Sequence, residues 1–163
     1  MSATAASFRD VLAQWASGVS IVTTNDDGML YGLTVSSFSS LSLDPPLVLV
    51  CLANTNRMVG MIAASRGFAV SILTSAQAAA SNYFARQGRL PTPDFTEIEG
   101  EWTPSGQPVI RGALAWMACE LQSTFVEGDH TVVIGRVLET HTTTGGQPLL
   151  YWSRSYRQIG PPL

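Results

Sequence analysis

Residues 32–52 read GLTVSSFSSLSLDPPLVLVCL, and they say more about the fold class than any other part of the chain. Their first part is an extended segment rich in hydroxyl side chains, and a polar bend follows at residues 42–44. Pro45 and Pro46 then lead into the continuous apolar run 47–52, which is typical of a strand that is buried on both faces. We therefore predict a β protein in which 47–52 is the central strand of the core.

Before this stretch, the pattern predicts a helix followed by a β-hairpin. The apolar residues of the helix recur at helical spacing: Phe8, Val11, Leu12 and Trp15. Ser7 with Asp10 forms a capping pair in front of them, and Gly18 ends the helix. Residues 18–24 (GVSIVTT) and 29–38 flank a turn signal at 25–28, so we expect these two segments to pair as a hairpin.

After the apolar run, two more helices and a strand are expected. Asn54 and Thr55 are good N-cap residues for a helix that ends near 66–67, and the strand 68–73 follows at once. Ser75 can cap a third helix through residue 85, which Gly88 ends. Residues 90–108 are punctuated by Pro and Gly without periodicity, so we predict a long loop, a type of segment that is often functional.

The second half of the chain has the pattern of a β-meander. Strands are predicted at 116–125, 131–140 and 149–152, with turns at 127–129 and 145–146. Six or seven strands with tight turns and no βαβ alternation indicate an antiparallel closed or split barrel, with about three short helices packed outside it. No linker or repeat interrupts residues 1–163, which we interpret as one domain.

Composition narrows the functional classes. The net charge of −3 argues against nucleic-acid binding, because only nine cations are available to neutralise phosphates. All nine are arginines, which excludes a Schiff-base or P-loop lysine. Hydrophobic residues make up 45% of the chain and charged residues only 13%, which suggests apolar surface that a second subunit covers in a homodimer.

The two cysteines and the lengths of the apolar runs indicate the cellular compartment of the protein. Cys51 and Cys119 lie far apart inside apolar segments, so they are expected to be reduced core thiols, and no metal site can be written. We see neither a signal peptide nor an apolar run of the roughly 18–20 residues that a membrane span needs. The expectation is a cytoplasmic protein that does not enter a membrane.

Few residues are candidates for chemistry, and no GxGxxG, P-loop, GxSxG or HExxH motif is present. The hydroxyls of 34–40 can hold the edge of a heterocycle or a phosphate, or they can belong to an exposed edge strand. Asn54 and Thr55 can present free N–H groups to a phosphate or only cap the helix. His130 follows Asp129 in a turn, where that carboxylate could orient the ring or raise its pKa, or the histidine can be an ordinary hairpin residue.

Four ordered blocks make the chain similar to a known family. These are GVSIVTT (18–24), the 32–52 stretch, EGDHTVVIGRV (127–137) and PLLYWSRSYR (148–157), and they resemble the flavin reductase domain family. The resemblance runs from about Phe8 to Arg157. It implies an FMN-binding split barrel, usually a homodimer with flavin near the interface, and a reductase component of two-component flavin monooxygenases.

The resemblance also implies roles for individual residues. The segment that contacts the isoalloxazine ring corresponds to Thr34, Val35, Ser36, Ser37 and Ser40. The stretch that contacts the ribityl chain and phosphate corresponds to Leu52, Ala53, Asn54 and Thr55. The chain departs from the family at Met58, which cannot offer a hydroxyl to phosphate, and Arg57 is the candidate to compensate. His130 is implied to contact the nicotinamide, and Tyr156 with Arg157 to lie near the active site.

The function so implied is hydride transfer from NADH or NADPH to FMN or FAD, with the reduced flavin passed to a monooxygenase. This reaction is chemistry of the two cofactors, so the protein has mainly to stack the rings. A non-catalytic FMN-binding barrel remains an alternative, as does an enzyme like pyridoxamine-phosphate oxidase. The latter needs a strongly cationic pocket, which nine scattered arginines do not suggest.

Overall fold

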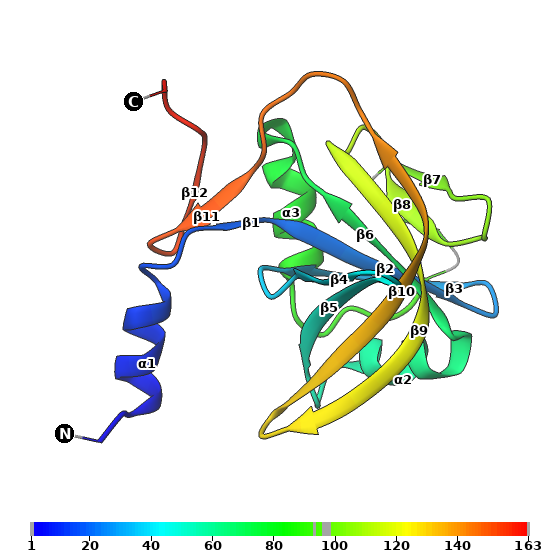
Figure 1. Ribbon diagram of the computed structural model, residues 1–163, viewed down its shortest axis with the longest axis horizontal. Helices are drawn as coiled ribbons and strands as arrows, with labels where there is room; N and C mark the ends of the chain where they lie inside the picture. Colours follow the sequence, from blue (N-terminus) through cyan, green and yellow to red (C-terminus); the bar gives the residue numbers. More distant parts are fainter. Residues whose placement is uncertain (1, 93, 96–98, 163) are drawn as a thin grey trace.

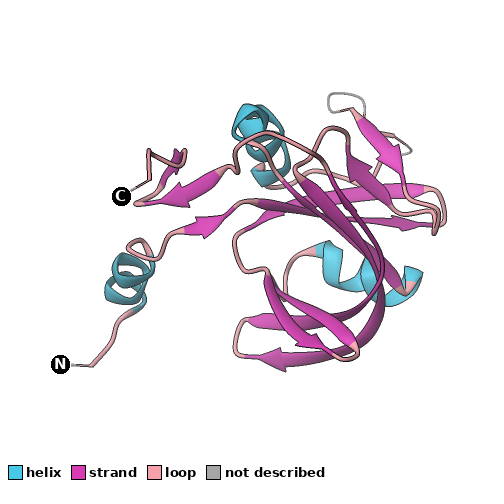
Figure 2. Cartoon of the chain, turned by 45° about the horizontal axis from the view of Figure 1, so that its top comes forward, coloured by secondary structure: helices cyan, strands magenta, loops and turns pink. Residues whose placement is uncertain are grey.

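The computed structural model describes residues 2–92, 94–95 and 99–162 and is built on one curved antiparallel sheet (Figure 1). The order of its seven strands is β3-β2-β6-β9-β10-β5-β4. Their bounds are Ser20–Asp26 (β2), Met29–Val35 (β3), Ser39–Leu43 (β4), Pro46–Ala53 (β5), Gly67–Ile72 (β6), Ala115–Glu127 (β9) and His130–Thr142 (β10). The sheet curls between its two edge strands, β3 and β4, which gives the predicted split barrel of mainly antiparallel strands (Figure 2).

The inner core lies within the curl of this sheet. Buried side chains from β2, β3, β5, β6, β9 and β10 form one cluster there, and helix α2 (Arg57–Ser65) adds Met58, Met61 and Ile62 to it. Three helices are present as predicted. Helix α2 turns these three side chains toward the core, whereas other residues of the helix are exposed.

The strands that are buried on both faces are β2 and β6, and the prediction of 47–52 as the central strand was wrong. Strand β5 lies second from the edge, and its burial alternates along the strand. Val22 of β2 faces the inner core, whereas Ile21 faces a second cluster that includes Phe84 of helix α3 (Ala78–Ala85). Helix α3 and the short 3-10 helix η1 (Ser75–Gln77) lie on the side of this second cluster, so β2 is covered twice.

Two segments differ from the sequence-based prediction in their detail. Residues 29–38 are not one strand, because β3 ends at Val35 and the chain turns before β4 begins at Ser39. The predicted loop 90–108 contains one strand, β7 (Gly100–Trp102), and the start of another, β8 (Pro108–Ile110), and the two pair with each other. Residues 93 and 96–98 of that loop lie outside the described part of the chain.

Helix α1 (Ala5–Leu12) stands away from the barrel (Figures 1 and 2). Its N-cap is Thr4, which forms a capping box with Ser7, so the predicted Ser7 cap lies one turn too late. The helix leads into strand β1 (Ser17–Gly18), which pairs with β11 (Leu150–Trp152), and β11 pairs with β12 (Ser155–Arg157). None of the helices in the described residues is long and apolar enough to cross a membrane.

Candidate functional site

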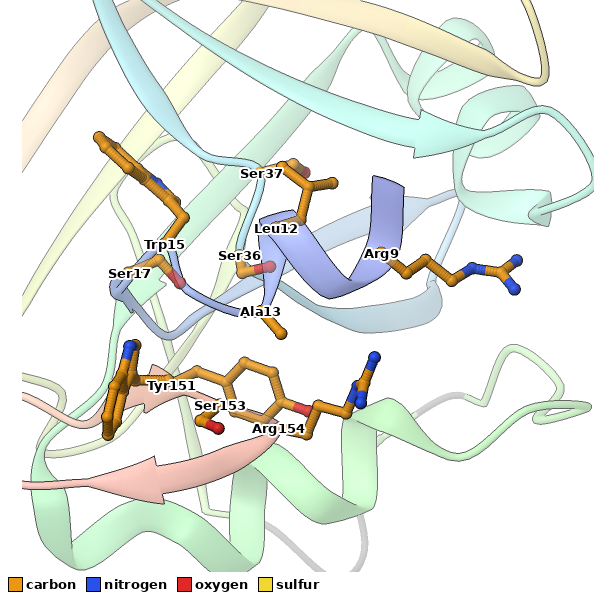
Figure 3. A pocket seen from close by; sticks show the side chains of 11 residues that line it. Arg9, Leu12, Ala13, Trp15, Ser17, Ser36, Ser37, Tyr151, Ser153 and Arg154 are labelled. Atoms are coloured by element: carbon orange, nitrogen blue, oxygen red, sulfur yellow. The ribbon is translucent and has the colours of Figure 1, made fainter. Parts of the chain in front are cut away.

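Three cavities lie in a row beside the end of β3 and the C-terminal part of α3. The α1 cavity, of about 570 Å³, lies between α1, the turn from β11 to β12, and Ser36 with Ser37 (Figure 3). The middle cavity, of about 170 Å³, lies beside Thr34, and the arginine cavity, of about 340 Å³, lies between α3 and the start of α2. Ser36 and Tyr151 line both the α1 and the middle cavities, and Ala85 lines both the middle and the arginine cavities.

The hydroxyl-rich segment forms the wall between the first two cavities and is held at both ends. The Thr34 Oγ1 donates to the carbonyl of Ser81 in α3 at 2.7 Å. The Ser37 Oγ donates to the carbonyl of Cys51 in β5 at 2.8 Å and accepts from its N–H at 3.2 Å. The Ser36 hydroxyl makes no hydrogen bond with any described residue, so it is available to a ligand.

Other residues of the predicted flavin segments are placed differently. The side chains of Val35 and Leu52 are buried in the inner core, so only their backbone can reach a ligand. Ser40 is exposed on β4, where it pairs with Val48, and it does not line these three cavities. Ala53 does line the arginine cavity, at the end of β5.

The arginine cavity combines sequence-predicted residues with two that the sequence analysis missed. Thr55 and Arg57 line it from the start of α2, and Arg86 and Arg89 line it from the segment after α3. The Arg89 guanidinium donates to the carbonyls of Gly32 and Phe84, the latter at 3.2 Å, and lies 5.2 Å from the centre of the Tyr31 ring. Three arginines around one cavity favour an anionic ligand such as a phosphate.

The Asn54 side chain joins the end of β5 to the turn between β9 and β10. Its Nδ2 donates to the carbonyl of Gly128 at 3.2 Å, and its Oδ1 accepts from the Thr131 hydroxyl at 2.8 Å. The backbone N–H of Asn54 also donates to the carbonyl of Asp129, at 2.9 Å. The predicted capping role of Asn54 and Thr55 was therefore wrong, and Asn56 caps α2 through its Oδ1.

His130 occupies this turn and is about half exposed. Its Nδ1 lies 2.6 Å from the Oδ1 of Asp129, and its backbone pairs with Ala53 of the arginine cavity. The pKa of Asp129 lies below its ordinary value, mainly because of the hydrogen bond with His130 and then because of the charge on that ring. The Asp129 carboxylate therefore fixes one ring nitrogen and leaves the other available.

Tyr156 and Arg157, next to each other in sequence, face different sides. Tyr156 lines the middle cavity, and its hydroxyl donates to the Ser81 Oγ at 2.8 Å. The Arg157 guanidinium lies 5.7 Å from the centre of the Trp152 ring, and Arg157 does not line the middle cavity, although both residues border a further hollow beside Ser75. Their alternation along β12 accounts for the difference, because successive side chains of a strand point to opposite faces.

The two cysteines are free thiols, and neither has the setting of a nucleophile. Cys119 is buried in the inner core, and this burial raises the pKa of its thiol to about 12. Cys51 is half-buried on β5, with its backbone bound by Ser37. Thiolate chemistry is therefore not expected at Cys119, and the chemistry of the site depends on its hydroxyls, arginines and histidine.

Comparison with known proteins gives consistent matches over most of the chain. A family model described as "Flavin reductase like domain" matches residues 12–160. The reductase subunit HsaB of a flavin-dependent monooxygenase from Rhodococcus jostii is 39% identical over 94% of this chain and 77% of its own length. The NADH-dependent flavin reductase StyB from Pseudomonas fluorescens is 36% identical over 96% of this chain and 89% of its own length.

The fold of the chain also matches that of a solved structure. It is the NADH:FAD oxidoreductase SgcE6 from Streptomyces globisporus, in complex with NAD and FAD fragments. The two structures superpose with a TM-score of 0.89 at 30% sequence identity, over 96% of this chain and 93% of that chain. The curved sheet and the arrangement of its strands are thus shared with a protein that handles both nucleotides.

Proposed function

The chain belongs to the family of flavin reductase like domains, and we propose that it transfers hydride from NADH or NADPH to FMN or FAD. The observation that carries this proposal is the position of residues 34–37 between two cavities. One side of the segment leads to the arginine cavity and the other opens into the α1 cavity. A flavin can therefore lie with its phosphate at one end of the row and its ring at the hydroxyls.

The residues fit the two ends of a flavin nucleotide. The free hydroxyl of Ser36 and the N–H groups of its segment can bind the polar edge of the ring. Arg57, Arg86 and Arg89 can bind the phosphate, and Arg57 takes over the contact that Met58 cannot make. The Met58 side chain is fully buried in the inner core, which removes it from any ligand.

His130 is proposed to orient the nicotinamide. In the reaction, the C4–H bond of the dihydronicotinamide breaks, an N5–H bond of the flavin forms, and a proton from solvent completes the reduced flavin. The main task of the protein is to hold the two rings with their reacting atoms roughly 3–3.5 Å apart, and a positioned imidazole and a hydroxyl-lined wall can contribute to this. Asp129 holds the imidazole by its Nδ1, so its Nε2 is the atom that can meet the carboxamide of the nicotinamide.

The names of the relatives favour this reading over the two alternatives. HsaB is a reductase subunit of a monooxygenase and StyB an NADH-dependent reductase, whereas a non-catalytic barrel or a pyridoxamine-phosphate oxidase would have neither role. We accordingly propose that the reduced flavin passes to a monooxygenase component. We also propose that the chain acts as a homodimer and works in the cytoplasm, where reduced nicotinamide nucleotides are available.

The test is aerobic oxidation of NADH and of NADPH, followed at 340 nm, with FMN, FAD and riboflavin added in turn. We expect oxidation to require both the protein and added flavin, and the ratio of kcat/KM values to identify the preferred pair. Riboflavin lacks a phosphate, so its KM should exceed that of FMN if the arginine cavity binds the phosphate. No acceleration with any flavin and either nucleotide would overturn the proposed function.

A further inference from the structure

The row of cavities has cationic residues at both ends, and the proposed function uses only one of these ends. The arginine cavity accounts for the phosphate of the flavin. The hydride donor also carries a pyrophosphate, and its nicotinamide has to reach the ring from the open side of residues 34–37. That side is the α1 cavity, so the anionic part of the donor has to lie at or beyond its walls.

Two arginines line the α1 cavity, and only one of them has an available guanidinium. In Figure 3 the side chains of Arg9 and Arg154 extend to one side of the cavity and Trp15 to the other. Arg154 forms an ion pair with Asp10, which fastens α1 to the turn between β11 and β12. The guanidinium of Arg9 makes no hydrogen bond or ion pair with the described residues, and it is exposed.

The position of Arg9 relative to the turn of His130 gives a second indication. The positive charge of Arg9 lowers the pKa of Asp129, as the smallest of several effects of which those of His130 are the largest. The guanidinium therefore lies within electrostatic reach of the Asp129–His130 pair, although the two sites are more than a hundred residues apart in sequence. A donor held by His130 would bring its phosphates close to the exposed Asp129 carboxylate, and a nearby cation offsets that repulsion.

We propose that Arg9 is a further substrate-binding residue, which holds the pyrophosphate of the reduced nicotinamide dinucleotide while the nicotinamide lies against Ser36 and Ser37. This inference rests on the proposed function. It assigns the two ends of the row to different substrates, the arginine cavity to the flavin phosphate and Arg9 to the hydride donor. Arg9 also makes α1 part of the active site, although none of the residues of this helix is buried.

The experiment compares the wild-type protein with Arg9→Gln and Arg9→Lys in steady-state assays. Arg9→Gln should raise the KM for the dinucleotide about fivefold, as the loss of an exposed ionic contact predicts. Its KM for the flavin should not change, and Arg9→Lys should recover part of the loss, because it keeps the charge without the planar fork. Added salt should raise the dinucleotide KM of the wild type more than that of Arg9→Gln.

A hydride donor without phosphates separates binding from a structural effect. With 1-benzyl-1,4-dihydronicotinamide, Arg9→Gln and the wild type should reduce flavin at equal rates.

Arg136→Gln is the matched control, because Arg136 is an exposed arginine that pairs with Glu120 in the sheet, and it should leave both KM values unchanged. An equal loss with the benzyl donor, a parallel rise in the flavin KM, or an unchanged dinucleotide KM would each overturn this inference. A wild-type protein that is inactive with every donor would instead overturn the proposed function.

Discussion

His130 shows how much a single side chain can depend on a residue from another strand. The turn that carries His130 is tied to β5 by three hydrogen bonds of Asn54, two from its side chain and one from its backbone. These bonds fix the turn of His130 against the end of β5, where Ala53 lines the arginine cavity. The two motifs that looked separate in the sequence, at 54–55 and at 128–130, therefore form one unit.

Replacing His130 by Ala should impair the use of the nicotinamide and spare the flavin. We expect a higher KM for the dinucleotide or a lower kcat, by about tenfold, because one charge-assisted or polar contact to the donor is lost. The KM for FMN or FAD should stay within a factor of two, because residues 34–37 and the arginines are untouched. Stopped-flow reduction of flavin measures the hydride step, and wild-type rates there would rule out this role.

The titration of Asp129 gives a readout of the same variant that does not depend on activity. The hydrogen bond with His130 lowers the pKa of this carboxyl, so the pair favours the folded state above the ordinary aspartate pKa of about 3.9. This contribution is lost as the pH falls through the lower folded-state value. In His130→Ala the pKa should rise back toward its ordinary value, which carboxyl NMR can follow, and an unchanged value would show that the pair does not form in solution.

At the scale of single residues, local sequence patterns assigned some side chains to the wrong structural task. Asn54 has the residue type and position of an N-cap, yet Asn56 caps the helix and Asn54 binds the distant turn. The choice between two asparagines two residues apart depends on a contact with Gly128, which no local pattern contains. Arg89 was missed for a similar reason, because its carbonyl partners lie on β3 and α3.

At the scale of elements, the barrel contains a close approach of β10 to β6 and β9. A Cβ added at Gly135 of β10 would lie 2.4 Å from the Phe68 ring and 2.9 Å from the Cys119 Cβ. All three residues are buried, so the neighbours cannot move aside easily. The glycine also lies at a register shift between β9 and β10, where the sheet bends.

Gly135→Ala should therefore lower the free energy of unfolding by about 1–3 kcal/mol. Gly60→Ala in α2 is the matched control, because nothing lies within 4 Å of a Cβ at that position. It should be neutral or raise the free energy of unfolding by up to about 1 kcal/mol, since alanine favours helix. Urea unfolding followed by circular dichroism measures both, and equal stabilities for the two variants would contradict the packing argument.

The types of elements could be predicted, but their burial could not. The β2–β3 hairpin and the β9–β10 pair follow from turn chemistry, which is local, and both are present. The predicted third strand of the meander does not join them, because β11 pairs with β1 and β12 in a separate sheet. The apolar run 47–52 indicated a fully buried strand, whereas it is β2 that has a helix on one face and the inner core on the other. Which strand receives α3 depends on tertiary packing, and periodicity does not report it.

At the scale of the whole molecule, the sum of tight turns without βαβ units was sufficient to predict the split barrel. The row of cavities was not predictable, because it brings Ser36, Ala85 and Tyr151 together from three distant parts of the chain. The resemblance to a family supplied the flavin segments, but it did not supply Arg9 or Arg89. Arg89 lies on a segment that contacts β3, and Arg9 lies on a helix near the turn of His130. Both arrangements exist only in the folded chain.

The exposed apolar face of α1 carries the last prediction, which concerns assembly. Phe8 of α1 is 58% exposed, Trp15 in the segment after the helix is 75% exposed, and no residue of α1 is buried in the single chain. An amphipathic helix with no apolar contacts gains little stability by itself, so a second copy that covers this face would stabilise it. We expect a homodimer in sedimentation equilibrium and a shift toward monomer in Phe8→Glu.

Trp102→Glu is the control for this prediction, because Trp102 is 57% exposed and lies on β7 at the other side of the molecule (Figure 1). If any loss of exposed apolar surface weakened association, both variants would dissociate. If α1 is the interface, only Phe8→Glu dissociates. Its circular dichroism spectrum should still show a folded barrel, since Phe8 contributes nothing to either core cluster.

A wild-type protein that stays monomeric at micromolar concentration would contradict the dimer, and a dimer unaffected by Phe8→Glu would move the interface away from α1. Because α1 also carries Arg9 at the wall of the α1 cavity, a dimer formed through this helix would link assembly to the binding of the hydride donor.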